Sequence, residues 1–126
     1  MVTHEVGKRM LRNTLQAVEW ISDKEYQKRV WIGGEAPNDF DETACHFFDN
    51  GDPVLSEYKK CDITENQYQI LKKFRDKFRY FSDEHSYEPE FIDTPEWNEI
   101  VKMAKEENQT AVRFLEDCTV VKKVPS

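Results

Sequence analysis

Hydrophobic residues recur at three- and four-residue steps along most of the chain, which is the spacing of one face of an α-helix. Within residues 4–21 the repeating positions are Val6, Met10, Leu11, Thr14, Leu15, Val18 and Ile21. A second series lies within residues 65–84 and consists of Ile70, Leu71, Phe74, Phe78 and Phe81. A third follows Thr94 and consists of Trp97, Ile100, Val101, Ala104, Ala111 and Leu115. The pattern predicts three long helices.

Capping residues predict where these and other helices begin. Thr64 and Gln67 have the spacing of a capping box, and Thr94 followed by proline is typical of an N-cap and a first helical position. Ser22 with Glu25 predicts the start of a short helix over residues 22–31 that turns Tyr26, Val30 and Trp31 inward. The helix over residues 65–84 is followed by an expected loop at 84–93, and residues 119–126 are expected to form a short extended or frayed tail.

Two further short helices are predicted between residues 39 and 58. The first is expected to end at Asn50-Gly51, and the second to restart at Asp52-Pro53, with proline in the first turn. Since no stretch alternates with the two-residue period of a strand, the expected fold is all-α. We expect one domain, residues 1–126, folded as a compact irregular bundle of five to six helices. Its length suffices for a hydrophobic core without disulfides or metals.

The charge is concentrated in one segment. The chain has 25 acidic and 18 basic residues, a net charge of −7. Residues 30–58 contain seven acids and neither Lys nor Arg, so the remainder balances at 18 against 18. The acids are Glu35, Asp39, Asp41, Glu42, Asp49, Asp52 and Glu57. With Trp31 and Phe40 as hydrophobic anchors, the segment predicts a surface that attracts and holds a basic protein, while Asp39, Asp41 and Asp52 also cap helices.

The same charge disfavours nucleic acid or an anionic membrane as the main partner. The basic run at residues 72–79 is interpreted as the solvated face of a helix and as a neighbour for the acidic segment. Residues 1–10 lack the apolar core of a signal peptide, and no apolar run reaches the length that crosses a bilayer, so a cytoplasmic location is expected. Three widely spaced cysteines, Cys45, Cys61 and Cys118, are expected to be reduced thiols.

Catalytic and metal chemistry finds little support. Glu42 and His46 lie four residues apart on one helix face, but two ligands do not make a metal site, and a simple hydrogen bond between them is expected. Cys45 is expected to be a buried structural thiol. Residues 46–57 resemble a calcium loop in length, yet His46 and Phe48 occupy positions that require oxygen ligands. No catalytic residue, metal or cofactor is therefore predicted.

In size, acidity and general character, the chain resembles the small acidic immunity proteins of polymorphic-toxin and contact-dependent growth inhibition systems. The resemblance is carried by the stretches WIGGEAPNDFDE and HFFDNGDPVLSEY. It implies a cognate toxin as partner, expected to be a nuclease whose basic active site the acidic surface covers, with one-to-one binding and no enzymatic activity. One alternative is a small helical adaptor or regulatory subunit that presents the Trp97 helix to a partner. Another is an enzyme that uses Glu42, Cys45 and His46.

Overall fold

The computed structural model describes residues 4–61, 63–84 and 89–107, and within them the chain is helical and contains no strand. The α-helices are α1 (His4–Ser22), α2 (Lys24–Tyr26), α3 (Phe40–Ser56) and α4 (Glu65–Glu84). Residues 95–107 form a further α-helix up to the last described position. A π-helix at Gln27–Ile32 and two 3-10 helices, Tyr58–Cys61 and Pro89–Asp93, connect them. The predicted all-α helical bundle is thus confirmed.

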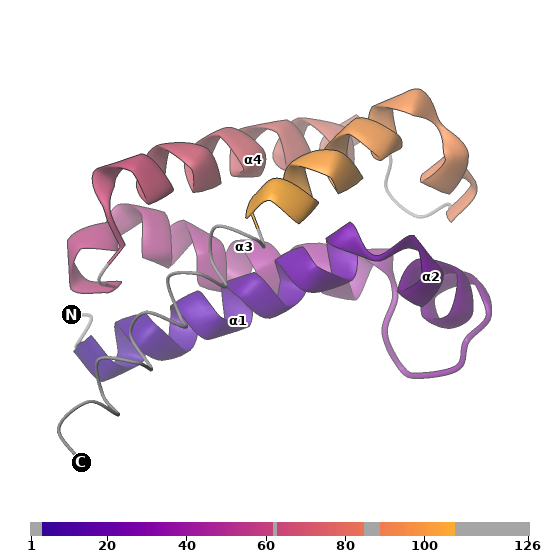
Figure 1. Cartoon of the computed structure of the whole chain (residues 1–126). Coiled ribbons are helices and arrows are strands. Elements are labelled where there is room, and N and C mark those ends of the chain that lie inside the picture. Colours follow the sequence, from indigo (N-terminus) through magenta and orange to yellow (C-terminus); the bar gives the residue numbers. More distant parts are fainter. Residues whose placement is uncertain (1–3, 62, 85–88, 108–126) are drawn as a thin grey trace, which may run out of the picture.

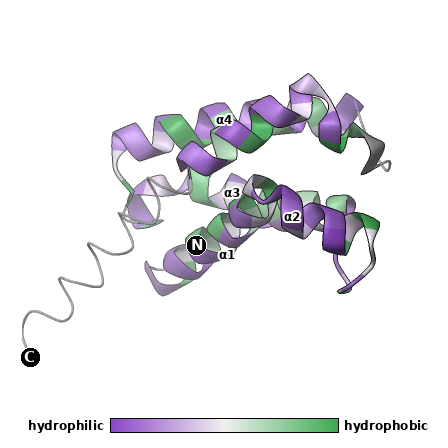
Figure 2. Ribbon diagram, turned by 45° about the vertical axis from the view of Figure 1, so that its right-hand side comes forward, coloured by the Kyte–Doolittle hydropathy of each residue, from purple (hydrophilic) through white to green (hydrophobic). Residues whose placement is uncertain are grey.

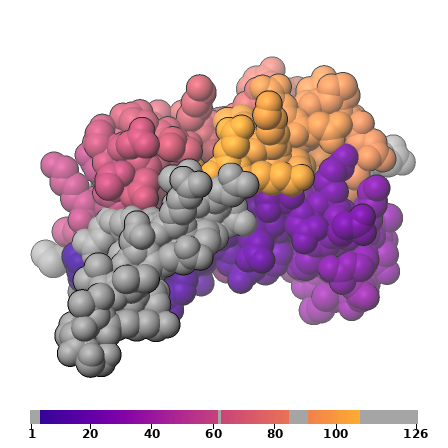
Figure 3. All heavy atoms as spheres, in the orientation of Figure 1, coloured from indigo at the N-terminus to yellow at the C-terminus, as the bar shows by residue number. Residues whose placement is uncertain are grey.

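The helices form two layers around a shared interior. α1 packs along α3, and in Figure 1 α4 and the helix at 95–107 lie together above that pair. Figure 3 shows the helix at 95–107 at the surface between α4 and α1. Figure 2 shows hydrophobic and hydrophilic stretches alternating along the ribbon of α4, as its amphipathic sequence predicts.

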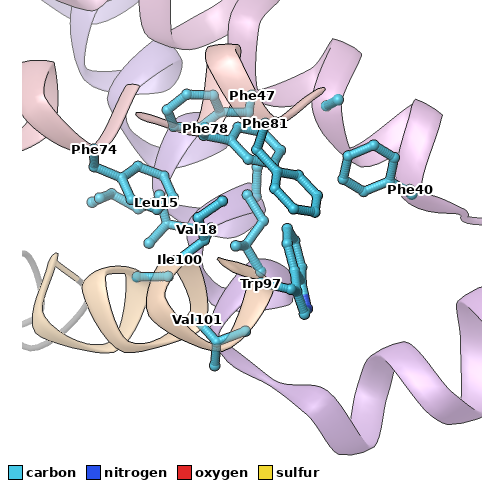
Figure 4. Close-up of a cluster of buried hydrophobic side chains, with 14 of the residues drawn as sticks. Leu15, Val18, Phe40, Phe47, Phe74, Phe78, Phe81, Trp97, Ile100 and Val101 are labelled. Carbon is cyan, nitrogen blue, oxygen red and sulfur yellow. The ribbon is translucent and has the colours of Figure 1, made fainter. Parts of the chain in front are cut away.

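Aromatic rings fill the interior (Figure 4). Trp97 is fully buried, and its ring centroid lies 4.9 Å from that of Phe91 and 5.2 Å from that of Phe81. Phe47 and Phe78, 5.5 Å apart and nearly perpendicular, connect α3 to α4. Such edge-to-face pairs are favourable beyond the area they bury. The predicted inward stripe of α4 is confirmed at Leu71, Phe74, Phe78 and Phe81, which are all buried, while Ile70 is only half-buried.

A buried glutamine ties the turn after α1 to the core. Gln27 is fully buried, and its Nε2 donates to the carbonyl oxygens of Trp20 at 2.9 Å and Ile21 at 2.8 Å. Its Oε1 accepts a hydrogen bond from Trp97 Nε1 at 2.9 Å. One side chain thus satisfies two carbonyls at the end of α1 and the indole N–H of the last helix, as a buried polar group requires.

The predicted capping box at Ser22 is wrong by one residue. Ser22 is the last residue of α1, and its hydroxyl donates to the carbonyl oxygen of Glu19. Asp23 is the N-cap of α2, since its carboxylate accepts from the backbone N–H of Tyr26 at 3.1 Å. The predicted inward positions Val30 and Trp31 are buried, although they lie on a π-helix, and Tyr26 is half-buried.

The two short helices predicted between residues 39 and 58 are instead one continuous helix, α3, with Pro53 inside it. Gly51 does not stop the helix because it is buried against α1, where an added Cβ would lie 3.4 Å from the Thr14 methyl group. Asn50 reinforces this contact, since its side chain accepts from Asn13 on α1 and donates to the carbonyl oxygen of His46. Tertiary packing therefore overrides the local stop signal.

The predicted caps at Thr64 and Thr94 are present. Thr64 and Gln67 exchange both hydrogen bonds of a capping box, at 2.8 and 3.1 Å. Thr94 caps the last helix, because its hydroxyl accepts from the backbone N–H of Trp97. α4 ends at Glu84, as predicted, but the expected loop at 84–93 contains the 3-10 helix Pro89–Asp93, which buries Phe91 and Ile92. The predictions for Ala111, Leu115, Cys118 and the tail lie outside the described residues.

Candidate partner-binding surface

Three of the seven acids in the segment 30–58 are paired with bases from outside it. Glu35 Oε2 lies 2.7 Å from Arg29 Nη1, and Glu57 Oε2 lies 3.5 Å from Lys60 Nζ. Asp52 accepts from Arg75 of α4 through both carboxylate oxygens, at 2.9 and 3.3 Å. Asp52 is therefore not the helix cap that the sequence predicts. The bases that the segment lacks are thus supplied by residues that flank it in the sequence and by a helix that packs against it in the fold.

The remaining four acids lie exposed on α3. They are Asp39, Asp41, Glu42 and Asp49, called here the acidic face. Asp39 is the N-cap, as predicted, since its carboxylate accepts from the backbone N–H of Glu42 at 2.7 Å, whereas Asp41 lies in the first turn and is not the cap. Among the residues with described positions, no ion pair involves any of the four. Acids in the first turn of a helix are also stabilised by the positive end of the helix dipole.

Cys45 lies amid these carboxylates. It is exposed, so the prediction of a buried structural thiol is wrong. Local burial, and then the negative charges of Asp41, Asp49, Asp39 and Glu42, raise the pKa of its thiol. All four charges of the acidic face thus act on one point of the α3 surface. The raised pKa also opposes a nucleophilic role, because it suppresses the reactive thiolate.

The two predicted hydrophobic anchors are not at the surface. Trp31 is 8% exposed and Phe40 is 5% exposed, and their rings meet edge to face at 5.8 Å. Both belong to the aromatic core because the π-helix and the start of α3 converge on Trp97, which lies 5.9 and 5.8 Å from them. In this fold they cannot fill pockets of a partner, so that part of the predicted binding site is wrong.

Sequence reasoning missed an aromatic group that does reach the surface beside the acidic face. The half-buried ring of Trp20 on α1 lies parallel to that of Tyr26, with centroids 6.0 Å apart, and 5.4 Å from the ring of His46 on α3. Tyr26 Oη accepts from the side-chain amide of Asn38 at 2.8 Å, which holds the ring in place. Position 20 falls off the inward stripe of α1, and this was a signal for a surface tryptophan.

The positions of Glu42, Cys45 and His46 do not support the enzymatic alternative. The expected hydrogen bond between Glu42 and His46 is not formed, and His46 contacts Trp20 instead. In the residues with described positions, no group of three His, Cys, Asp or Glu side chains could hold a metal ion. In the adaptor alternative, the helix at 95–107 would have to present its outer face, because Trp97 itself is fully buried.

A cleft of about 540 Å³ lies between α4 and the helix at 95–107. Its lining residues are Ile70, Lys73, Phe74, Lys77, Glu99, Lys102, Met103 and Glu106. The charges around it are of both signs, and an ion pair at 3.1 Å joins Lys77 to Glu99 within the lining. It carries no cluster of reactive groups, and the acidic face is the better candidate for function.

No family model, curated protein or solved structure matches this chain. Across the helices of the described ranges, none combines the length and apolar character needed to cross a membrane.

Proposed function

We propose that this protein is an immunity protein that binds a cognate toxin, a nuclease, in the cytoplasm and neutralises it by covering its basic active site. The observation that supports this function is the acidic face, where Asp39, Asp41, Glu42 and Asp49 are exposed and have no basic partner among the described residues. Other acids of the same segment are paired within the chain. The unpaired acids of this segment are thus gathered at one helix, α3.

A surface of this kind suits a fast, specific inhibitor. Acids gathered on one side of a protein steer a basic partner toward it and raise the association rate by a factor of 10 to 1,000 at low salt. A nuclease active site must attract phosphates, so it presents the complementary positive charge. Carboxylates on a rigid helix can accept paired hydrogen bonds from its arginines. Binding would leave no room for the nucleic acid.

The test is whether a toxic domain is encoded next to this chain, and whether this protein protects cells from that domain. Co-expressed wild-type protein should restore growth, and purified protein should bind that domain one to one. The triple variant Asp41→Asn, Glu42→Gln, Asp49→Asn should associate at least about tenfold more slowly at low salt and lose most of the salt dependence. Failure of the wild type to protect or bind would refute the proposal.

A matched control removes the same charge elsewhere. Glu5, Glu84 and Glu96 are exposed and lie on three other helices. Changing all three to glutamine alters the net charge by the same amount as the triple variant on α3. If the control slowed association as strongly, the total charge rather than the acidic face would determine binding.

A further inference from the structure

The side of α3 that faces α4 shows how this helix holds a guanidinium group. Arg75 donates to both oxygens of Asp52 at 2.9 and 3.3 Å, while its Cζ lies 5.6 Å from the centroid of the Phe48 ring. Arg79 approaches the same ring at 5.0 Å. A carboxylate and an aromatic ring one helical turn apart thus bind one planar cation between them. The forked N–H groups of a guanidinium fit the two carboxylate oxygens, and its plane can lie over the face of an aromatic ring.

The opposite side of α3 repeats that composition without a cation. Its aromatic groups are Trp20, Tyr26 and His46, and Trp20 contacts each of the other two. Glu42 and Asp49 are exposed and lie one helical turn before and after His46, so their carboxylates are neighbours of the ring. We call these five residues the open flank. The described part of the chain contributes no ion pair to either carboxylate.

We propose that the open flank binds an arginine side chain of the partner protein, with the guanidinium group paired to Glu42 or Asp49 and stacked on the Trp20 and Tyr26 group. That the partner is a basic protein rests on the proposed function. The choice of arginine rests on the geometry of the chain itself. The rings are held in place before binding, because Asn38 donates to Tyr26 Oη and accepts from Thr43 Oγ1 at 3.3 Å. Less conformational entropy is therefore lost when the cation docks.

Arginine is favoured over lysine for two physical reasons. Its planar guanidinium can stack on a ring while its N–H groups reach a carboxylate, whereas a lysine ammonium is a compact and strongly hydrated charge. Plain charge attraction would treat the two alike, because their charges are equal. A preference for arginine therefore reports the aromatic part of the open flank and not the acids alone.

The test compares two capped peptides, octa-arginine and octa-lysine, binding to the whole protein at fixed salt. The wild type should bind octa-arginine at least roughly threefold more tightly, the size expected for an exposed cation–π contact. Trp20→Leu keeps an apolar side chain against the core, and should remove the preference while leaving octa-lysine binding unchanged. Glu42→Gln with Asp49→Asn should weaken binding of both peptides. The control Tyr80→Leu, which removes a ring that is 72% exposed on α4, should change the binding of neither peptide.

A second readout needs no variant. On addition of octa-arginine, the indole N–H signal of Trp20 should shift in NMR spectra, and those of the buried Trp31 and Trp97 should stay. Equal affinity for both peptides, a preference that survives Trp20→Leu, or an unmoved Trp20 signal would refute this inference. Toxin neutralisation without an arginine preference would overturn the inference alone. An arginine preference without neutralisation would overturn the proposed function alone.

Discussion

Replacing Gln27 with leucine should destabilise the protein strongly. Gln27 is fully buried and makes three hydrogen bonds of 2.8 to 2.9 Å, two to carbonyls at the end of α1 and one from Trp97 Nε1. Leucine has a similar volume, so the core stays filled. The substitution therefore isolates the polar role of the side chain from its packing.

The magnitude follows from the groups left behind. A buried donor without an acceptor costs about 1–3 kcal/mol, and here that donor is the indole N–H of Trp97. Each lost hydrogen bond to a carbonyl adds about 0.5–1.5 kcal/mol, and the apolar leucine side chain recovers part of the sum. We expect the free energy of unfolding to fall by about 3 kcal/mol. For a chain of this size, this corresponds to a drop in Tm of roughly 10 °C.

Urea unfolding followed by circular dichroism measures this change. The control is Gln16→Leu, on the exposed side of α1, which should shift the free energy of unfolding by less than about 0.5 kcal/mol. The double variant Gln27→Leu, Trp97→Phe tests the mechanism, because phenylalanine has no N–H to leave unpaired. Its destabilisation should be smaller than the sum of the two single variants by about 1–2 kcal/mol. An unchanged midpoint for Gln27→Leu, or strictly additive effects, would refute the reasoning.

Four further predictions concern two glycines, a buried acid and the exposed thiol. Gly7→Ala should lower the free energy of unfolding by about 2 kcal/mol, since the new Cβ would lie 2.8 Å from a backbone oxygen of the 3-10 helix Tyr58–Cys61. Gly51→Ala, with 3.4 Å of clearance, should be neutral or stabilising by up to about 1 kcal/mol in the same unfolding assay. Burial raises the pKa of the Glu107 carboxyl to about 7, so the unfolded state loses its proton first and stability falls between about pH 4.5 and 7. Relative to wild type, Glu107→Gln should gain stability over that range. If the urea midpoints of the two proteins changed by the same amount between pH 5 and pH 8, the prediction would be contradicted. Alkylation of Cys45 at pH 8 should be slower than that of a free cysteine peptide and faster in Asp49→Asn, measured by mass spectrometry; equal rates in the two proteins would argue against electrostatic control.

Much of the fold was predictable because the long helices have regular hydrophobic spacing and standard capping residues, which can be recognised in the sequence. The stripes of α1 and α4 and the caps at Thr64 and Thr94 needed no tertiary information. The continuity of α3 did need it. Asn50-Gly51 followed by Asp52-Pro53 is a local stop signal, and only the close approach of Gly51 to α1 explains why the helix continues.

The candidate site was half predictable. Charge counting along the sequence identified the acids, but not which of them meet a base through space, as Asp52 meets Arg75 across 23 residues. It also gave Trp31 and Phe40 a surface role because they stand among acids, although burial depends on the helices that converge on them. Trp20 lies ten residues before the acidic segment, and its closeness to His46 is a property of the α1 and α3 packing alone.

The central place of Trp97 has a consequence for how the chain folds during its synthesis. Its ring completes a cluster formed by residues made much earlier, including Trp31, Phe40 and Phe81. Until residue 97 leaves the ribosome, α1, α3 and α4 can pair only around an aromatic surface that lacks its cover. A nascent or truncated chain ending before Thr94 should therefore bind hydrophobic dyes and chaperones and aggregate readily. Synthesis of the helix at 95–107 is thus the step that covers this aromatic surface.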